Sequence, residues 1–153
     1  MGELCFLFGH RSAPHESVTT IRRLAEMLCL QYDVQDFVVG RYGQFDRNAV
    51  QAVKMAQMSC PEIRLHLLTV QHPAHQQFKI PPEFIDSIYP EGMERVPKKV
   101  ALPRANRYMI DRSGYVICYV NGPGNARELL EYARRRQEKS RLQIYNVAEI
   151  QTY

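Results

Sequence analysis

The sequence predicts a three-layer α/β fold, with helices on both faces of a mostly parallel sheet of about five strands. Two observations support this prediction. Short apolar runs closed by glycine or polar residues are typical of strands that are buried on both faces of a sheet. Between these runs lie stretches whose apolar residues recur at helical spacing. Strands that alternate with helices form βαβ units, and in such sheets ligands bind beyond the carboxyl ends of the strands.

The expected strands and helices alternate along the chain. The strands are the apolar or β-branched runs at residues 4–8, 36–39, 64–70, 115–120 and 142–147. The helices are the stretches with an apolar stripe at residues 16–31, 46–58, 104–112 and 126–136.

One segment does not fit this alternation. Residues 71–103 contain six of the nine prolines and are predicted to be irregular. Within them, residues 82–87 are predicted to form one helical turn, and residues 88–89 and 100–101 to be short extended pieces. A long irregular segment inside a domain is usually functional or mobile.

Length and composition limit the class of protein. The 153 residues are expected to form one domain, and their hydrophobic (45%) and charged (24%) contents are close to the globular average. This composition excludes a coiled coil and a collagen-like repeat. The net charge of +4 is small for a dedicated nucleic-acid binder. With no apolar run long enough for a membrane span and no visible signal peptide, the expected location is cytoplasmic.

The sequence predicts neither a metal site nor a disulfide. The cysteines form no C-x-x-C pair, and Cys5 and Cys118 lie inside apolar runs, as small buried hydrophobes do. His72 and His75 have no carboxylate or thiol at ligand spacing. We therefore expect no metal ion, and we expect no cofactor.

The loop after the first strand contains Gly9, His10 and Arg11. A glycine lets a ligand approach the backbone closely, and the free N–H groups at the start of the next helix attract anions. Arg11 adds a guanidinium that can bind a phosphate through two parallel hydrogen bonds. The alternative is a tight turn with solvated polar side chains.

The loop after the second strand runs from Gly40 to Arg47. Gly40 and Gly43 are predicted to form a turn beneath a helix start, where Asp46 caps the helix. The functional alternative for Asp46 is a hydrogen bond from a ribose hydroxyl. Tyr42 either stacks on a base or covers the edge of the sheet.

The loop after the strand at residues 115–120 places Gly122, Gly124 and Asn125 at the start of a helix. A G-x-G turn that leads into a helix has an anion-binding shape, although such turns are common. The motif is neither G-x-G-x-x-G nor a P-loop. Glu128, in the first helical turn, either complements the helix dipole or acts as a general base.

Two further segments are basic. Arg104, Asn106 and Arg107 lie on a short helix that either forms a wall over the ligand or exposes its arginines to solvent. Three consecutive arginines at residues 134–136 end the last predicted helix. There they either complement the helix dipole or contact a phosphate backbone.

Five short motifs occur in a fixed order along the chain. They are LFGHR at residues 7–11, GRYGQFDR at 40–47, GMERVP at 92–97, RANRYM at 104–109 and VICYV at 116–120. In this order the motifs resemble the YpsA-like branch of the SLOG superfamily, a bacterial and phage family of mostly unassigned function. The resemblance extends over residues 4–147.

The resemblance implies a Rossmann-like three-layer α/β/α fold with a pocket for a nucleotide or a nucleotide derivative. The superfamily includes the LONELY GUY cytokinin-activating phosphoribohydrolases, the DNA-processing protein DprA and domains associated with sensing nucleotide-derived ligands. The residues that match its motifs are Gly9, His10, Arg11, Gly40, Gly43, Asp46, Arg47, Asn106 and Arg107.

The sequence departs from the enzymes of that superfamily. The phosphoribohydrolases carry a P-G-G-x-G-T-x-x-E motif, whose glutamate helps to cleave the N-glycosidic bond. Here Glu128 is kept, but Asn125 replaces the threonine. Their R-K-x-x-M motif corresponds to Asn106-Arg107, so the catalytic arginine is missing unless Arg104 substitutes. Cleavage needs a placed carboxylate to stabilise an oxocarbenium-like transition state, and Glu128 alone does not favour an enzyme.

The expected function is therefore binding of a nucleotide or nucleotide-derived ligand, as a sensor or carrier, at the carboxyl edge of the sheet. Arg11, Arg107 and the backbone at Gly122 and Gly124 are expected to hold phosphate. One alternative is a nucleoside-5′-monophosphate N-glycosidase that uses Glu128, and another is DNA binding in the manner of DprA. The expected partner is a small molecule rather than nucleic acid or a membrane, and the strand edges are compatible with a homodimer.

Overall fold

A computed structural model describes residues 3–72, 74 and 79–150 of the chain. In this part of the chain, six strands pair in parallel in the order β4-β3-β2-β1-β5-β6. The strands are β1 (Leu4–Gly9), β2 (Asp36–Val39), β3 (Arg64–Leu68), β4 (Asp86–Ile88), β5 (Tyr115–Tyr119) and β6 (Gln143–Asn146). The helices are α1 (Ser17–Tyr32), α2 (Gln44–Ala56), α3 (Lys98–Arg112) and α4 (Asn125–Gln137), with short 3₁₀ helices η2 (Met93–Arg95) and η3 (Val147–Glu149).

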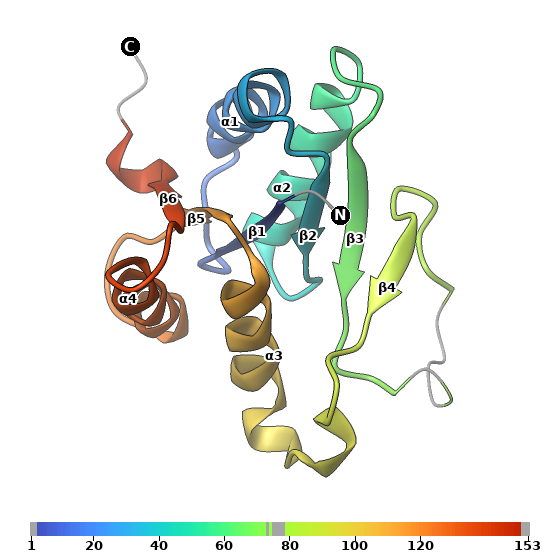
Figure 1. Cartoon of the computed structure of the whole chain (residues 1–153), viewed down its shortest axis with the longest axis vertical. Helices are drawn as coiled ribbons and strands as arrows, with labels where there is room; N and C mark the ends of the chain where they lie inside the picture. Colours follow the sequence, from blue (N-terminus) through green and yellow to red (C-terminus); the bar gives the residue numbers. More distant parts are fainter. Residues whose placement is uncertain (1–2, 73, 75–78, 151–153) are drawn as a thin grey trace.

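The helices cover both faces of the sheet (Figure 1). α1 and α2 pack on one face, around a core that includes Ile21 and Phe37. α3 and α4 pack on the other face, around a core that includes Met109 and Leu130. The predicted three-layer, Rossmann-like arrangement is confirmed, with six strands in place of about five. No helix in the described ranges combines the length and apolar character that crossing a membrane requires.

β1 lies in the middle of the sheet, between β2 and β5. Its side chains alternate between the two cores: Cys5 and Leu7 face α1 and α2, whereas Phe6 and Phe8 face α3 and α4. Because both faces are covered, β1 is a continuous apolar run without polar alternation. In the sheet, β2 lies on one side of β1 and β5 lies on the other. The loops after β1 and β5 therefore flank a topological switch point.

α3 begins six residues earlier than predicted. The predicted helix began at Arg104, the residue after Pro103. The structure instead includes Pro103 within α3, with Pro97 as the N-cap residue. Residues 100–101, predicted to be extended, lie in the first turn of this helix, and Ala101 packs against the second core. Burial of that face outweighs the local cost of the proline.

The edge strand β4 was predicted only in part: residues 88–89 were expected to be extended, and the strand ends at Ile88. Residues 82–87 were predicted to form a helical turn, but only a turn at Pro82 and Glu83 is present, and the strand follows it. Asp86–Ile88 pair in parallel with β3, where His66 is opposite Asp86. The His66 Nδ1 lies 2.7 Å from an Asp86 carboxylate oxygen. Pairing with β3, rather than an apolar pattern, makes this segment a strand.

A buried side chain continues the hydrogen bonding of the sheet beyond the end of β5. Asn146, which is 6% exposed, accepts a hydrogen bond from the Val120 N–H at 3.0 Å and donates its amide to the Val120 carbonyl at 3.0 Å. Its oxygen also accepts the N–H of Ala148 at 3.2 Å. This one amide therefore holds the residue that precedes the loop to α4.

Replacing Asn146 by alanine should destabilise the protein by about 2–4 kcal/mol, because the buried backbone groups of Val120 lose their partners. Urea denaturation measures this change in the free energy of unfolding. The matched control is Asn121→Ala, since Asn121 is exposed in the same loop. An equal effect of both substitutions would contradict a special role for Asn146.

Candidate functional site

A cavity of about 230 Å³ opens at the carboxyl edge of the sheet, next to β1. Its walls come from four separate segments: the end of β1, the loop between β2 and α2, the middle of α3, and the start of α4. The lining residues are Phe6, Leu7, Phe8, Gly9, His10, Arg11, Gly40, Tyr42, Gly43, Asp46, Leu102, Asn106, Asn125, Ala126 and Leu129.

Eight of the residues selected from the sequence line this cavity. They are Gly9, His10, Arg11, Gly40, Gly43, Asp46, Asn106 and Asn125. The apolar part of the wall was not selected, because Leu102, Ala126 and Leu129 look like ordinary core positions in the sequence. In the sequence, only their place on the side of α3 and α4 that faces the loops could have indicated that they line a cavity.

The loop after β1 is fixed to the start of α2. The N–H of Gln44 donates to the Arg11 carbonyl at 3.0 Å. Gly43 lies directly against this loop, and a Cβ atom added to it would lie 2.8 Å from the Arg11 Cα. The glycine thus allows two loops to pack together, rather than allowing a ligand to approach the backbone.

A buried amide on α2 holds the next part of the loop. Asn48, 1% exposed, donates to the Pro14 carbonyl at 2.9 Å and to the Ser17 hydroxyl at 3.1 Å. Its carbonyl oxygen accepts a hydrogen bond from the Gln44 side chain at 2.8 Å. The connection between β1 and α1 is therefore anchored on α2, and the cavity wall that it carries is fixed in place.

Asp46 lies in the first turn of α2 and faces the cavity. The predicted cap at Asp46 is wrong in position: the helix begins at Gln44, and Gly43 is the N-cap residue. The Asp46 carboxylate accepts the N–H of Tyr42 at 2.7 Å. Burial nevertheless raises the pKa of Asp46 from 3.8 to about 6, against the smaller lowering effect of the Tyr42 N–H. A hydroxyl that donates to this carboxylate would favour its ionised form.

His10 has an unsatisfied nitrogen in the wall of the cavity. Its Nε2 is buried and has no hydrogen-bond partner among the described residues. Its backbone N–H donates to the Tyr119 carbonyl at 3.1 Å, which fixes the position of the residue. Buried polar atoms are nearly always paired, so a polar ligand atom is the natural partner for this nitrogen.

The start of α4 forms the fourth wall. Gly124 is the N-cap residue with φ of 129°, in the region that favours glycine, and no side chain caps the helix. Gly122 has φ of 117°, and its carbonyl accepts a hydrogen bond from the Arg127 Nε at 3.3 Å. Neither glycine lines the cavity itself, but both shape the turn that presents Asn125 to it.

Three of the selected residues lie in neighbouring hollows. Arg47 lines a hollow of about 350 Å³ that shares Gly40, Gly43 and Asp46 with the main cavity. The other two, Arg107 and Glu128, line a hollow of about 70 Å³ on the other side, which shares Asn106 and Asn125 with the cavity.

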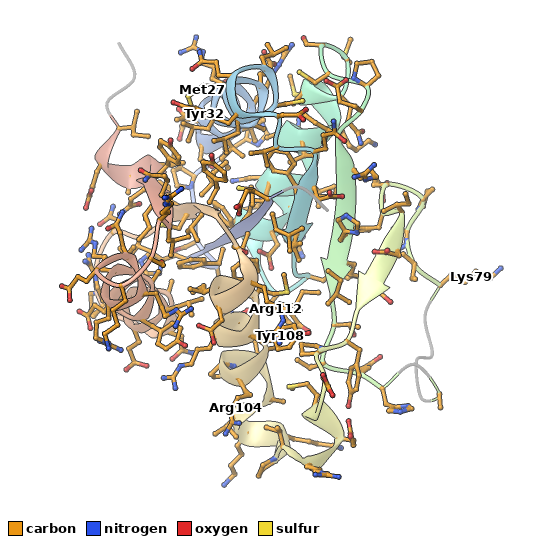
Figure 2. All side chains as sticks on the ribbon, in the orientation of Figure 1. Met27, Tyr32, Lys79, Arg104, Tyr108 and Arg112 are labelled. Carbon is orange, nitrogen blue, oxygen red and sulfur yellow. The ribbon has the colours of Figure 1, made fainter. Side chains whose placement is uncertain are left out.

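Arginines line the cavity and the two hollows next to it: Arg11 lines the cavity, Arg47 one hollow and Arg107 the other. Arg11, Arg47 and Arg107 are exposed. The Arg11 guanidinium has no ion-pair partner in the described part of the chain, whereas the Arg107 guanidinium carbon lies 5.3 Å from the centre of the Tyr132 ring. Arg104 is exposed on α3, where the guanidinium of Arg112 stacks on Tyr108 at 3.5 Å (Figure 2). This distribution suits an anionic ligand.

The arginines at residues 134–136 are partly neutralised within the chain. Arg134 lies 3.3 Å from the Glu149 carboxylate, and Arg136 lies 3.2 Å from the Asp111 carboxylate. Arg135 lies near the Tyr132 ring, with 6.0 Å from its guanidinium carbon to the ring centre. The cluster is thus less available for a phosphate backbone than its sequence indicates.

No family model and no curated protein sequence matches the chain. Solved structures do resemble it. The molybdenum cofactor binding protein from the phototrophic bacterium Rippkaea orientalis has 14% sequence identity and a TM-score of 0.56, and the match covers 90% of this chain and 73% of that protein. DNA processing protein A from Helicobacter pylori, described with a single-stranded DNA binding mode, has 18% identity and a TM-score of 0.59.

The chain spans 63% of the H. pylori protein, while the match covers 89% of this chain. At such low identity these similarities show the fold alone.

Replacing Asp46 by asparagine should stabilise the ligand-free protein at neutral pH, because the amide can still accept the Tyr42 N–H without burying a charge. In the wild type, the raised pKa of Asp46 means that the folded state holds its proton to higher pH than the unfolded state. Stability is therefore lost as pH rises from about 4 to about 6.

Urea denaturation of both proteins from pH 4 to pH 8 measures the effect. The variant should be more stable by up to about 3 kcal/mol at pH 7, and the difference should become small near pH 4. Other titrating groups are common to both proteins and cancel in the difference. A difference that does not change with pH would show that Asp46 is not the titrating group.

Proposed function

We propose that this chain binds a nucleotide or a nucleotide-derived anion in the cavity at the carboxyl edge of the sheet, as a YpsA-like member of the SLOG superfamily. The observation that carries the proposal is the convergence of His10, Arg11, Asp46, Asn106 and Asn125, from four separate segments, on one cavity. Two of these segments flank the switch point between β1 and β5, where ligands bind in open α/β sheets.

The wall of the cavity supplies the three kinds of contact that a nucleotide needs. The uncapped start of α4 and the guanidinium of Arg11 are suited to phosphate. The Asp46 carboxylate and the Asn106 amide can bind sugar hydroxyls. The rings and aliphatic groups of Phe8, Leu102 and their neighbours offer an apolar surface for a base. Because the cavity is smaller than the ~300–1,000 Å³ of typical ligand pockets, the ligand would extend into the hollow beside Arg47.

A second candidate function is hydrolysis of a nucleoside monophosphate. Glu128 and Arg107 line the same small hollow, which shares two asparagines with the cavity. A ligand that reached this hollow would place its glycosidic bond near a carboxylate. The exposure of Glu128 argues against hydrolysis, because its carboxylate is solvated and is not buried beside the cavity.

Nucleotide binding should raise the melting temperature, and Arg11→Ala should weaken binding by about 10–100-fold because a charge-assisted hydrogen bond to phosphate is lost. Thermal-shift screening with nucleoside monophosphates, cyclic dinucleotides and ADP-ribose measures the first effect. A ligand at 100 times its dissociation constant stabilises a protein by about 2.7 kcal/mol. Isothermal titration with the best ligand then measures the second effect.

The control is Arg23→Ala, which removes the same charge from an exposed position on α1. Arg23→Ala should bind like the wild type. The proposal is wrong if none of these compounds shifts the transition, or if both variants bind as the wild type does.

Release of free base from a nucleoside monophosphate would instead favour the second candidate, provided that Glu128→Gln abolishes it. The matched control is Glu131→Gln, because Glu131 is also exposed on α4 and lines none of the hollows around the cavity. Retention of single-stranded DNA that falls steeply with salt would favour the DNA-binding alternative.

A further inference from the structure

A second cluster of reactive side chains lies at the opposite edge of the sheet from the cavity. Cys29 lies in the last turn of α1, Cys60 follows the end of α2, and Glu62 precedes β3. Helices that connect parallel strands run back along the sheet, so these helix ends meet at the amino edge of the strands. None of the three residues lines the cavity or its neighbouring hollows.

The three ligand atoms of this cluster converge. The two Sγ atoms and a carboxylate oxygen all lie within 4.8 Å of one another. The Cys29 thiol donates a hydrogen bond to the Glu62 Oε1 at 3.2 Å. Within the described ranges, no other group of three such side chains comes together in this way.

We propose that Cys29, Cys60 and Glu62 bind one Zn²⁺ ion, with a water molecule as the fourth ligand. Zinc–sulfur bonds of 2.3 Å and zinc–oxygen bonds of 2.0–2.2 Å at tetrahedral angles separate two sulfurs by about 3.8 Å, and a sulfur and an oxygen by about 3.6 Å. The 3.2 Å between Cys29 and Glu62 is within half an ångström of that separation. Glu62 is exposed, so its side chain can make the small adjustment at little cost.

The chemistry of the ligands favours zinc over magnesium and calcium. Two thiolates exclude Mg²⁺ and Ca²⁺, which prefer oxygen ligands, while zinc accepts both sulfur and carboxylate oxygen. Two thiolates and a carboxylate carry three negative charges, which a divalent cation reduces to one. A coordinating thiol gives up its proton to solvent, so zinc takes the place of the proton that Cys29 now shares with Glu62.

The environment of the two sulfurs favours a metal site over a redox switch. Cys60 is fully buried and Cys29 is 4% exposed, so an oxidant has little access to either sulfur. The exposed Glu62 leaves one side open through which an ion can enter.

A zinc ion at this position would join the end of α1 to the segment between α2 and β3. That segment is already held by a hydrogen bond from the Gln57 side chain to the Ile63 carbonyl at 3.0 Å. The metal would therefore add stability to a corner that is already ordered, while the water would keep one coordination position open.

Titration of the reduced, metal-free full chain with Co²⁺ tests the proposal directly. One ion per chain should bind and give a sulfur-to-cobalt charge-transfer band together with the strong visible absorption of tetrahedral cobalt. Added Zn²⁺ should displace the cobalt and raise the melting temperature. Loss of a residue that only supports a metal ligand typically weakens metal binding by roughly 10–100-fold. Glu62→Gln, which changes a ligand itself, should weaken zinc binding by at least as much. Because Glu62 is exposed, the variant should remain folded.

Two controls separate this site from the rest of the molecule. Glu131→Gln removes an exposed carboxylate from α4, and Cys118→Ala removes a buried thiol from β5; both should bind zinc like the wild type. Cys60→Ala should abolish the charge-transfer band, and its circular dichroism spectrum shows whether it is folded. The proposal is overturned if the wild type gives no thiolate band, or if Cys60→Ala and Glu62→Gln both keep full zinc affinity.

Discussion

The candidate site depends on how the backbone N–H and C=O groups find hydrogen-bond partners where the parallel strands end. Beyond the last rung of a ladder, buried N–H and C=O groups have no strand partner and would be costly if left unpaired. Two buried amides supply the partners: Asn146 pairs with both backbone groups of Val120, and Asn48 binds the Pro14 carbonyl and the Ser17 hydroxyl. Each amide fixes one of the loops that flank β1, so the cavity between the loops is formed before any ligand arrives.

The features that the sequence predicted are those set by local pattern. Apolar runs and helical stripes located five strands and four helices, and the carboxyl-edge rule then predicted that the loops after several strands lie at one edge of the sheet. Eight of the residues selected from these loops and from α3 line one cavity in the structure. Features set by contacts between distant residues were missed, wholly or in part. β4 is a strand because Asp86–Ile88 pair with β3, and α3 continues through Pro103 because Ala101 is buried. In the same way Cys29 and Cys60, 31 residues apart in the sequence, meet only because α1 and α2 end at the same edge.

Two groups in the site lower the stability of the folded protein, and a sheet edge without a binding role would not need them. Asp46 is a carboxylate whose pKa burial raises to about 6, and the Nε2 of His10 is buried without a partner among the described residues. Groups of this kind reduce the free energy of unfolding, which is small in natural proteins. A ligand with a hydroxyl for Asp46 and a polar atom for His10 would offset both costs at once. In the proposed nucleotide site, the same two groups would reject an apolar molecule of similar size and so would add specificity to affinity.

The helices α1 and α2 connect the two edges of the sheet, and this decides whether the zinc site can influence the cavity. At the carboxyl edge, the Asn48 amide already fixes the start of α1 to α2 through Ser17. At the amino edge, zinc would fix the end of α1 to the segment that follows α2. An ion that binds there changes ligand affinity only if the loops near Arg11 have two arrangements that zinc distinguishes. Asn48 and the bond from Gln44 to the Arg11 carbonyl both brace these loops without any contact to the zinc ligands, so zinc should add stability to the pair of helices and leave ligand affinity unchanged.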